Sequence, residues 1–118
     1  MKAGNYKNIW LIFVNIKAKP GFVFNDLVNA EGADLNNVFT GAWANVLVKA
    51  VTISEAIETI PGGLGELNFE TVFIDKAENV MSLIEYKELN EGMIKEADWL
   101  LNSGFIFKIS DKIFPYII

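Results

Sequence analysis

The sequence predicts an α+β fold, a two-layer sandwich in which helices cover one face of an antiparallel sheet of about four strands. Two observations support this. Segments with apolar residues at every second position, typical of strands, alternate with segments in which apolar residues recur every three or four positions, typical of helices. The chain has 118 residues and is 52% hydrophobic, which is enough for one core. We therefore expect a single domain over residues 1–118.

The first strand is expected over residues 8–18. Its even positions from Trp10 onward are all apolar, whereas its odd positions change from apolar to polar at Asn15. Pro20-Gly21 favours a turn at its end, because proline fixes φ and glycine accepts positive values. Residues 22–38 are expected to form a short helix or an irregular excursion.

The second strand is expected over residues 42–51, and a helix follows it. Thr52 and Glu55 have the spacing of a capping box, in which each side chain accepts a hydrogen bond from a main-chain N–H of the first turn. The run Pro61-Gly62-Gly63 is expected to kink or end this helix. The residues expected to face the core are Ile53, Ala56, Ile57 and Ile60.

The second half of the chain continues the alternation. Further strands are expected over residues 69–75, 80–86 and 105–109. Between the last two, a helix is expected to begin after Asn90 and to end at Gly104 in a left-handed cap. Strands and helices interleaved in this way favour a ferredoxin-like topology with the helices on one face.

On this phasing, the other face of the sheet has no helices to cover it. It is too apolar to be left in water. Its large side chains are Leu11, Phe13, Trp43, Leu47, Thr71, Phe73 and Phe107. We expect this open face to form a homodimer interface. A ligand-lined face and a cover formed by the apolar C-terminal tail are the alternatives.

Six residues of the open face are the candidate binding residues. They are Phe13, Trp43, Asn45, Leu47, Lys49 and Phe73. Asn45 and Lys49 are the polar members of this set. A lysine among apolar neighbours can bind an anionic ligand, but it can equally extend its ammonium group into water.

The chain contains no histidine, no cysteine and no arginine. Histidine is the commonest general acid or base near neutral pH, and cysteine supplies nucleophiles and soft metal ligands. The glycine-rich run at residues 61–65 lacks the Lys-Ser/Thr ending of a phosphate-binding loop. We therefore expect no catalytic residues, no cofactor and no metal site, and we favour a protein that is not an enzyme.

Charge and composition limit the partners. The net charge of −5 disfavours nucleic acid, which requires a basic face. The apolar stretch near the N-terminus is too short to span a membrane, and Asn15 and Lys17 interrupt it in a way that disfavours a signal peptide. The absence of cysteine fits a reducing cytoplasm. The many lysines, asparagines and isoleucines, with no arginine, are typical of an AT-rich bacterial genome.

Three functions remain. The leading one is a non-enzymatic homodimeric domain that binds a protein partner or a small ligand. The second is an acidic cytoplasmic inhibitor of the immunity type, which neutralises a basic partner. Its steering residues would be Glu85, Glu88, Glu91 and Glu96. The third is a small isomerase or lyase with a carboxylate base in an apolar pocket. Its base would be Asp75 or Glu70, and its donor would be Tyr86 or Tyr116.

Overall fold

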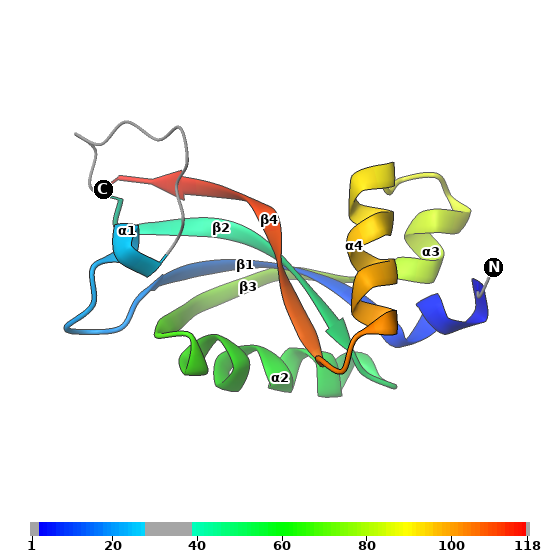
Figure 1. Ribbon diagram of the computed structural model, residues 1–118, viewed down its shortest axis with the longest axis horizontal. Helices are drawn as coiled ribbons and strands as arrows, with labels where there is room; N and C mark the ends of the chain where they lie inside the picture. Colours follow the sequence, from blue (N-terminus) through cyan, green and yellow to red (C-terminus); the bar gives the residue numbers. More distant parts are fainter. Residues whose placement is uncertain (1–2, 28–38, 118) are drawn as a thin grey trace.

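The computed structural model describes residues 3–27 and 39–117, with the side chains of residues 3–5 and 26 left out. Within these residues, four strands form one antiparallel sheet in the order β3-β1-β2-β4 (Figure 1). The strands are β1 (Ile9–Ala18), β2 (Gly41–Lys49), β3 (Phe69–Asn79) and β4 (Phe107–Tyr116). β1 and β2 are therefore the central strands, and β3 and β4 are the edges.

The helices lie on both faces of this sheet (Figure 1). They are the 3-10 helix η1 (Ala3–Asn8), α1 (Phe24–Leu27), α2 (Ile53–Glu66), α3 (Val80–Glu85) and α4 (Glu91–Asn102). We call the face toward α2 the first face and the opposite one the second face. α3 and α4 lie at one end of the second face.

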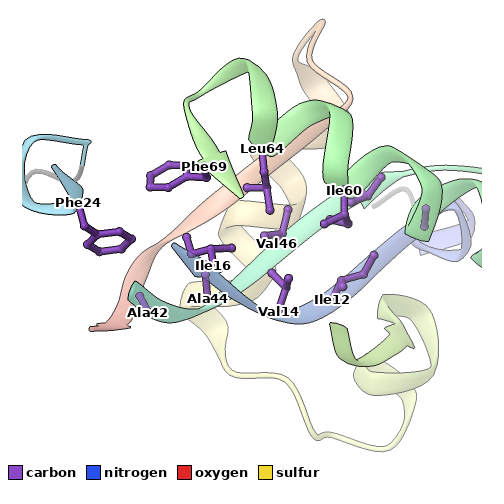
Figure 2. Packing of buried hydrophobic residues seen from close by; sticks show 12 residues of the cluster. Ile12, Val14, Ile16, Phe24, Ala42, Ala44, Val46, Ile60, Leu64 and Phe69 are labelled. Atoms are coloured by element: carbon purple, nitrogen blue, oxygen red, sulfur yellow. The ribbon is translucent and has the colours of Figure 1, made fainter. Parts of the chain in front are cut away.

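The first face carries the larger core (Figure 2). The even residues of β1 and of β2 point toward α2, and small residues such as Ala42 and Ala44 let the helix approach closely. α2 contributes one row of buried residues at a spacing of four, Ala56, Ile60 and Leu64. Phe24 of α1 and Phe69 of β3 close the core at one end, with ring centroids 5.7 Å apart. The predicted inward face of the two central strands is confirmed.

A second, smaller core lies on the other side of the sheet. Ile9 of β1 and Leu47 of β2 are fully buried there against Val80 of α3 and Ala97 and Leu100 of α4. Tyr6 of η1 completes this core, and its hydroxyl donates a hydrogen bond to the Asp98 carboxylate of α4. The N-terminal segment is thereby tied to a helix from the second half of the chain.

α2 begins where the sequence predicts and ends later. The Thr52 hydroxyl accepts a hydrogen bond from the Glu55 N–H at 3.2 Å, as the first half of a capping box requires. The helix then passes through Pro61 without a break as far as Glu66, so the expected end at this run is wrong. Ile53 and Ile57 are exposed, because the buried row is a single stripe that excludes them.

The prediction failed most for β3 and the segment after it. Residues 80–86 form helix α3 instead of a strand, with the Asn79 side chain accepting from the Ser82 N–H at its start. β3 is longer than expected and has two register shifts against β1, which leave Val72 and Asp75 as extra residues. Thr71 therefore lies opposite Ile16 on the first face, not beside Phe73.

The C-terminal strand also departs from its predicted phase. Phe107 pairs with Val48 and packs against the first-face core, so its expected place on the open face is wrong. β4 is longer than expected and includes residues 114–116 of the expected apolar tail. Asn90 caps α4 through a 2.8 Å bond from the Met93 N–H, as expected. The end of α4 is capped by Ser103 in an extended conformation, so the left-handed cap expected at Gly104 is absent.

The α+β fold with a four-stranded antiparallel sheet is confirmed. The ferredoxin-like topology and the placement of all helices on one face are not. β2, α2 and β3 form one crossover unit with β1 between the two strands. The next crossover, through α3 and α4, runs over the opposite face. Because the helices that the structure describes alternate between the two faces, part of the second face carries none of them.

The segment predicted as a short helix or irregular excursion is described only in part. α1 is its helical piece, and Gly21 before it has a φ of 91°, which fits the predicted turn. Residues 28–38 of this segment lie outside the described residues. Among the helices that the structure describes, none is long and apolar enough to cross a membrane.

Candidate functional site

Three predicted site residues form an aromatic cluster on the second face. Phe13 of β1 and Trp43 of β2 stack with ring centroids 5.1 Å apart and an interplanar angle of 12°. Phe73 of β3 meets Trp43 edge-on, at 5.2 Å and 90°. Both geometries are favoured for aromatic pairs. The three rings therefore make one surface that spans three strands.

The register of the sheet explains why these rings meet. Asn15 pairs with Trp43 on one side and with Phe73 on the other, so the two large rings flank a short side chain in one row across the sheet and can meet each other. Phe13 lies two residues along β1, on the same face. The bulge at Val72 is what brings Phe73 into this row. The cluster therefore depends on a feature that strict alternation does not predict.

Two further aromatic residues extend the cluster toward β4, and neither was predicted as a binding residue: Phe114 was expected only in the apolar C-terminal tail, and Tyr116 only as a candidate donor of an enzyme. Phe114 pairs with Trp43 and is 45% exposed. The Tyr116 hydroxyl donates to Asn15 Oδ1 at 2.5 Å. Gly41 makes this reach possible, because a Cβ there would lie 2.6 Å from the Tyr116 hydroxyl oxygen. The bulge in β4 hid both residues, since it shifts their phase relative to β2.

The other predicted site residues do not all join the cluster. Asn45 pairs with Phe13 and is half-buried beside it. Leu47 is fully buried beneath α4, so it is a core residue and not part of a free surface. The Lys49 ammonium donates to the Ser103 carbonyl at 2.9 Å, at the end of α4. α3 and α4 thus divide the predicted open face into a covered end and an aromatic end.

Charges of both signs surround the aromatic end. Lys17 pairs with Glu70 at 3.3 Å, and Lys76 pairs with Glu78 at 3.5 Å. These four side chains are partly exposed, so their pairing energies are small. The Lys112 ammonium lies 5.8 Å from the centre of the Phe114 ring. We call the three rings of Phe13, Trp43 and Phe73, together with Phe114, the aromatic patch.

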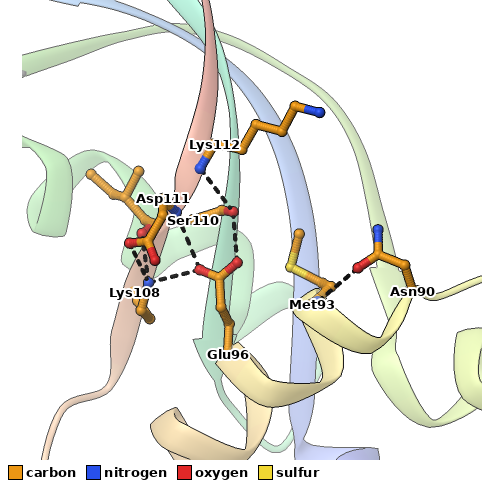
Figure 3. Close-up of polar contacts among 8 residues, drawn as sticks. Asn90, Met93, Glu96, Lys108, Ser110, Asp111 and Lys112 are labelled. Atoms are coloured by element: carbon orange, nitrogen blue, oxygen red, sulfur yellow. Dashed lines mark hydrogen bonds and ion pairs between the residues drawn. The ribbon is translucent and has the colours of Figure 1, made fainter. Parts of the chain in front are cut away.

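A separate polar cluster joins α4 to β4 (Figure 3). The Glu96 carboxylate accepts from the Lys108 ammonium at 2.7 Å, from the Ser110 hydroxyl at 2.9 Å and from the Asp111 N–H at 3.2 Å. The side chains of Glu96 and Lys108 are each 18% exposed. These residues span the place where β4 bulges against β2.

This cluster is built to hold the bulge. Burial alone lowers the pKa of the Lys108 ammonium, but its hydrogen bonds to Glu96 and Asp111 and their negative charges outweigh burial and raise the pKa above its ordinary value. Lys108 is therefore a fixed cation and a poor base. The buried Ser110 hydroxyl donates to a carboxylate and has no free approach for a substrate. We read the cluster as structural.

The residues proposed for a carboxylate-base enzyme are not brought together. Glu70 pairs with Lys17, and Asp75 is exposed at a bulge. Tyr86 is exposed after α3, and Tyr116 donates to Asn15. Within the described part of the chain, no group of three or more acidic residues is arranged to hold a metal ion.

The four acidic residues proposed to steer a basic partner do not form one exposed group either. Glu85, Glu88 and Glu91 are exposed around the turn between α3 and α4. Glu96 is not among them, because Lys108 and Ser110 occupy its carboxylate. The predicted acidic face therefore has three members.

Comparisons with known proteins add no assignment: no family model matches the chain, and no curated protein or solved structure is significantly similar to it.

Proposed function

We propose that this chain is a non-enzymatic binding domain that works as a homodimer through its aromatic patch. One observation carries the proposal. Phe73 is 49% exposed and Phe114 is 45% exposed, although both belong to an aromatic surface that crosses all four strands of the sheet. Aromatic side chains of this size contribute most of the energy at protein interfaces when a partner covers them.

A second copy is the occupant that the surrounding charges favour. The rim of the patch carries lysines and glutamates side by side, Lys17 with Glu70 and Lys76 with Glu78. Two copies related by a two-fold axis present the same surface to each other, so each lysine can face a glutamate of the other copy. A patch rimmed by one sign of charge would repel its own copy.

The direct test is the oligomeric state of a charged variant. Phe73→Glu places a carboxylate within the proposed interface, at the β3 end of the aromatic patch, and we expect it to convert a dimer into a monomer. Phe22→Glu is the matched control, because Phe22 is 48% exposed in the turn after β1 and the change in net charge is the same. Light scattering and sedimentation velocity at micromolar concentration measure both.

The outcomes separate clearly. A dimeric wild type, a dimeric Phe22→Glu and a monomeric Phe73→Glu support the proposal. A wild type that is monomeric at these concentrations overturns it. So does a dimer that survives Phe73→Glu, since its interface then lies elsewhere. Circular dichroism of each variant shows that the sheet is intact.

A basic partner is the second candidate, and one observation favours it. Glu85, Glu88 and Glu91 are exposed and make no ion pair with the lysines that the structure describes. Such a surface accelerates association with a basic protein, and its effect falls with ionic strength. Capture from the native lysate at low and moderate salt tests it. Failure to recover a basic protein at either salt concentration contradicts this candidate and leaves the dimer unaffected.

A further inference from the structure

A cleft lies on the first-face side of the molecule, away from the aromatic patch. It has a volume of about 450 Å³ and runs between α2 and the segment that joins α4 to β4. In Figure 1 this segment passes beside α2 before β4 begins. The lining residues of α2 include Glu58, Gly62, Gly63 and Glu66. The opposite wall is formed by residues 104–107.

The α2 wall of the cleft contains two glycines in mid-helix. Each costs up to about 1 kcal/mol of helix stability relative to alanine. Gly63 has a reason within the chain, because a Cβ there would lie 2.8 Å from the Phe107 ring. No contact within the chain requires glycine at position 62, since a Cβ there would meet no atom within 4 Å. Its bare backbone faces open space in the cleft.

The opposite wall is apolar and exposed. Phe105 and Ile106 are among the most exposed large apolar residues of the described chain. Phe105 also stacks on Trp99 of α4, with centroids 5.7 Å apart and an angle of 14°. The apolar surface therefore continues from the cleft over Phe105 to Trp99. Exposed apolar surfaces of this kind mark binding sites in monomeric proteins.

Two carboxylates complete the cleft. Glu58 and Glu66 are exposed and make no ion pair with the lysines that the structure describes. They lie eight residues apart on α2, which separates them by about 12 Å along the helix axis. Residues four apart in an extended chain are about 13 Å apart and point to the same side. The two spacings match.

We propose that this cleft binds an extended segment of a partner protein that presents basic side chains on one side. Two such side chains, four residues apart, reach Glu58 and Glu66. The residue midway between them packs its side chain against Phe105 and Ile106, over the bare backbone at Gly62. The negative rim selects lysine or arginine, and the apolar wall holds their long aliphatic stems. This site does not depend on the aromatic patch or on a homodimer.

The probe is a short peptide with this pattern, acetyl-Arg-Gly-Leu-Gly-Arg-amide. Its control is the same peptide with glutamate in place of both arginines. The full chain, labelled with 15N, is titrated with each. The amide signals of Gly62, Gly63 and Gly104 report on the cleft, whereas those of Gly41 in β2 and Gly92 in α4 report on other regions. We expect the arginine peptide to shift the first three signals alone, and the glutamate peptide to shift none.

Matched variants test the contacts. The pair Glu58→Gln and Glu66→Gln removes both rim charges and should weaken binding by about threefold to tenfold. The pair Glu85→Gln and Glu88→Gln changes the net charge equally but lies outside the cleft, so binding should change less than about twofold. Gly62→Leu places a side chain in the cleft, and its Cβ meets no atom of its own chain within 4 Å, so it should abolish the shifts of Gly63 and Gly104.

Three results overturn the proposal. The first is that the arginine peptide, at millimolar concentration, leaves the amide signals of the cleft glycines unchanged. The second is that the two pairs of Glu→Gln substitutions weaken peptide binding equally, which would show that the peptide responds to net charge alone. Shifts in the aromatic patch instead of the cleft place the peptide on the dimer face. None of these results bears on the oligomeric state, which is measured separately.

Discussion

Large apolar side chains form both ends of the second sheet face, but the helices that the structure describes cover only one of these ends. Leu11 and Leu47 pair across β1 and β2 at one end, and Phe13, paired with Asn45, begins the aromatic end two residues away. α3 and α4 bury the leucine end. No helix among the described residues packs on the aromatic end, where Phe73 stays half-exposed. The sequence of a strand therefore shows which of its faces is apolar, but the path of a later crossover decides whether the chain covers that face.

The largest expected difference between the two ends concerns stability. Leu47→Ala removes a fully buried side chain from beneath α4 and should lower the free energy of unfolding by about 2–5 kcal/mol. Phe73→Ala removes a half-exposed ring and should lower it by about 1 kcal/mol, with its main effect on association. Urea denaturation of both variants at one protein concentration makes the comparison. Equal losses would show that the aromatic end is as well covered as the leucine end.

The sequence predicted the central strands because their alternation is regular. β1 and β2 pair over nine consecutive positions without a bulge, so the period of two fixes which residues point inward. β3 and β4 could not be phased in this way, since each carries extra residues at bulges. Thr71 was misassigned for this reason, and Phe114 was left outside the last strand. Phe107 pairs with Val48 before the bulge in β4, so the bulge does not explain its misassignment.

The sequence pattern could not predict where the helices pack, and the reason is different. Val80 to Glu85 has a short apolar run that fits either a strand or a helix, and the Asn79 cap decides it. The side of the sheet that α4 packs against depends on the direction of the crossover from β3, which leaves no local signal. Glu96 appeared as an exposed acid because its partners, Lys108 and Ser110, follow more than ten residues later.

A smaller effect is expected from the tie between η1 and α4 at the covered end. The hydrogen bond to Asp98 raises the pKa of the Tyr6 hydroxyl, and burial and the Asp98 charge add to the rise. A raised pKa in the folded state means that the stabilising contribution is complete below the ordinary tyrosine value of about 10 and is lost as the pH rises through the folded-state value. Stability should therefore fall above about pH 10.

Tyr6→Phe removes the group responsible. It should cost about 1–3 kcal/mol near neutral pH and make the decline above pH 10 less steep. The Lys108 pKa is also raised, so part of the decline should remain in this variant. Thermal melts between pH 7 and pH 11 measure both effects. An unchanged alkaline slope in Tyr6→Phe would show that Tyr6 does not titrate with unfolding.

The smallest expected effect on the fold lies at the rim of the aromatic end, and it gives the sharpest test of a two-fold interface. Lys17 and Glu70 form a partly exposed pair, so reversing either charge should change folding stability by about 1 kcal/mol or less. In the proposed dimer both copies carry Lys17→Glu, so each contact between Lys17 and a glutamate of the other copy becomes a contact between two carboxylates, and the change should weaken association more than it weakens the fold. The double variant Lys17→Glu with Glu70→Lys restores both the pair within each copy and the opposite charges between copies, so its dimer affinity should return toward that of the wild type. Sedimentation equilibrium at two salt concentrations follows the three proteins. A double variant that associates no better than Lys17→Glu would mean that the rim does not face its own copy.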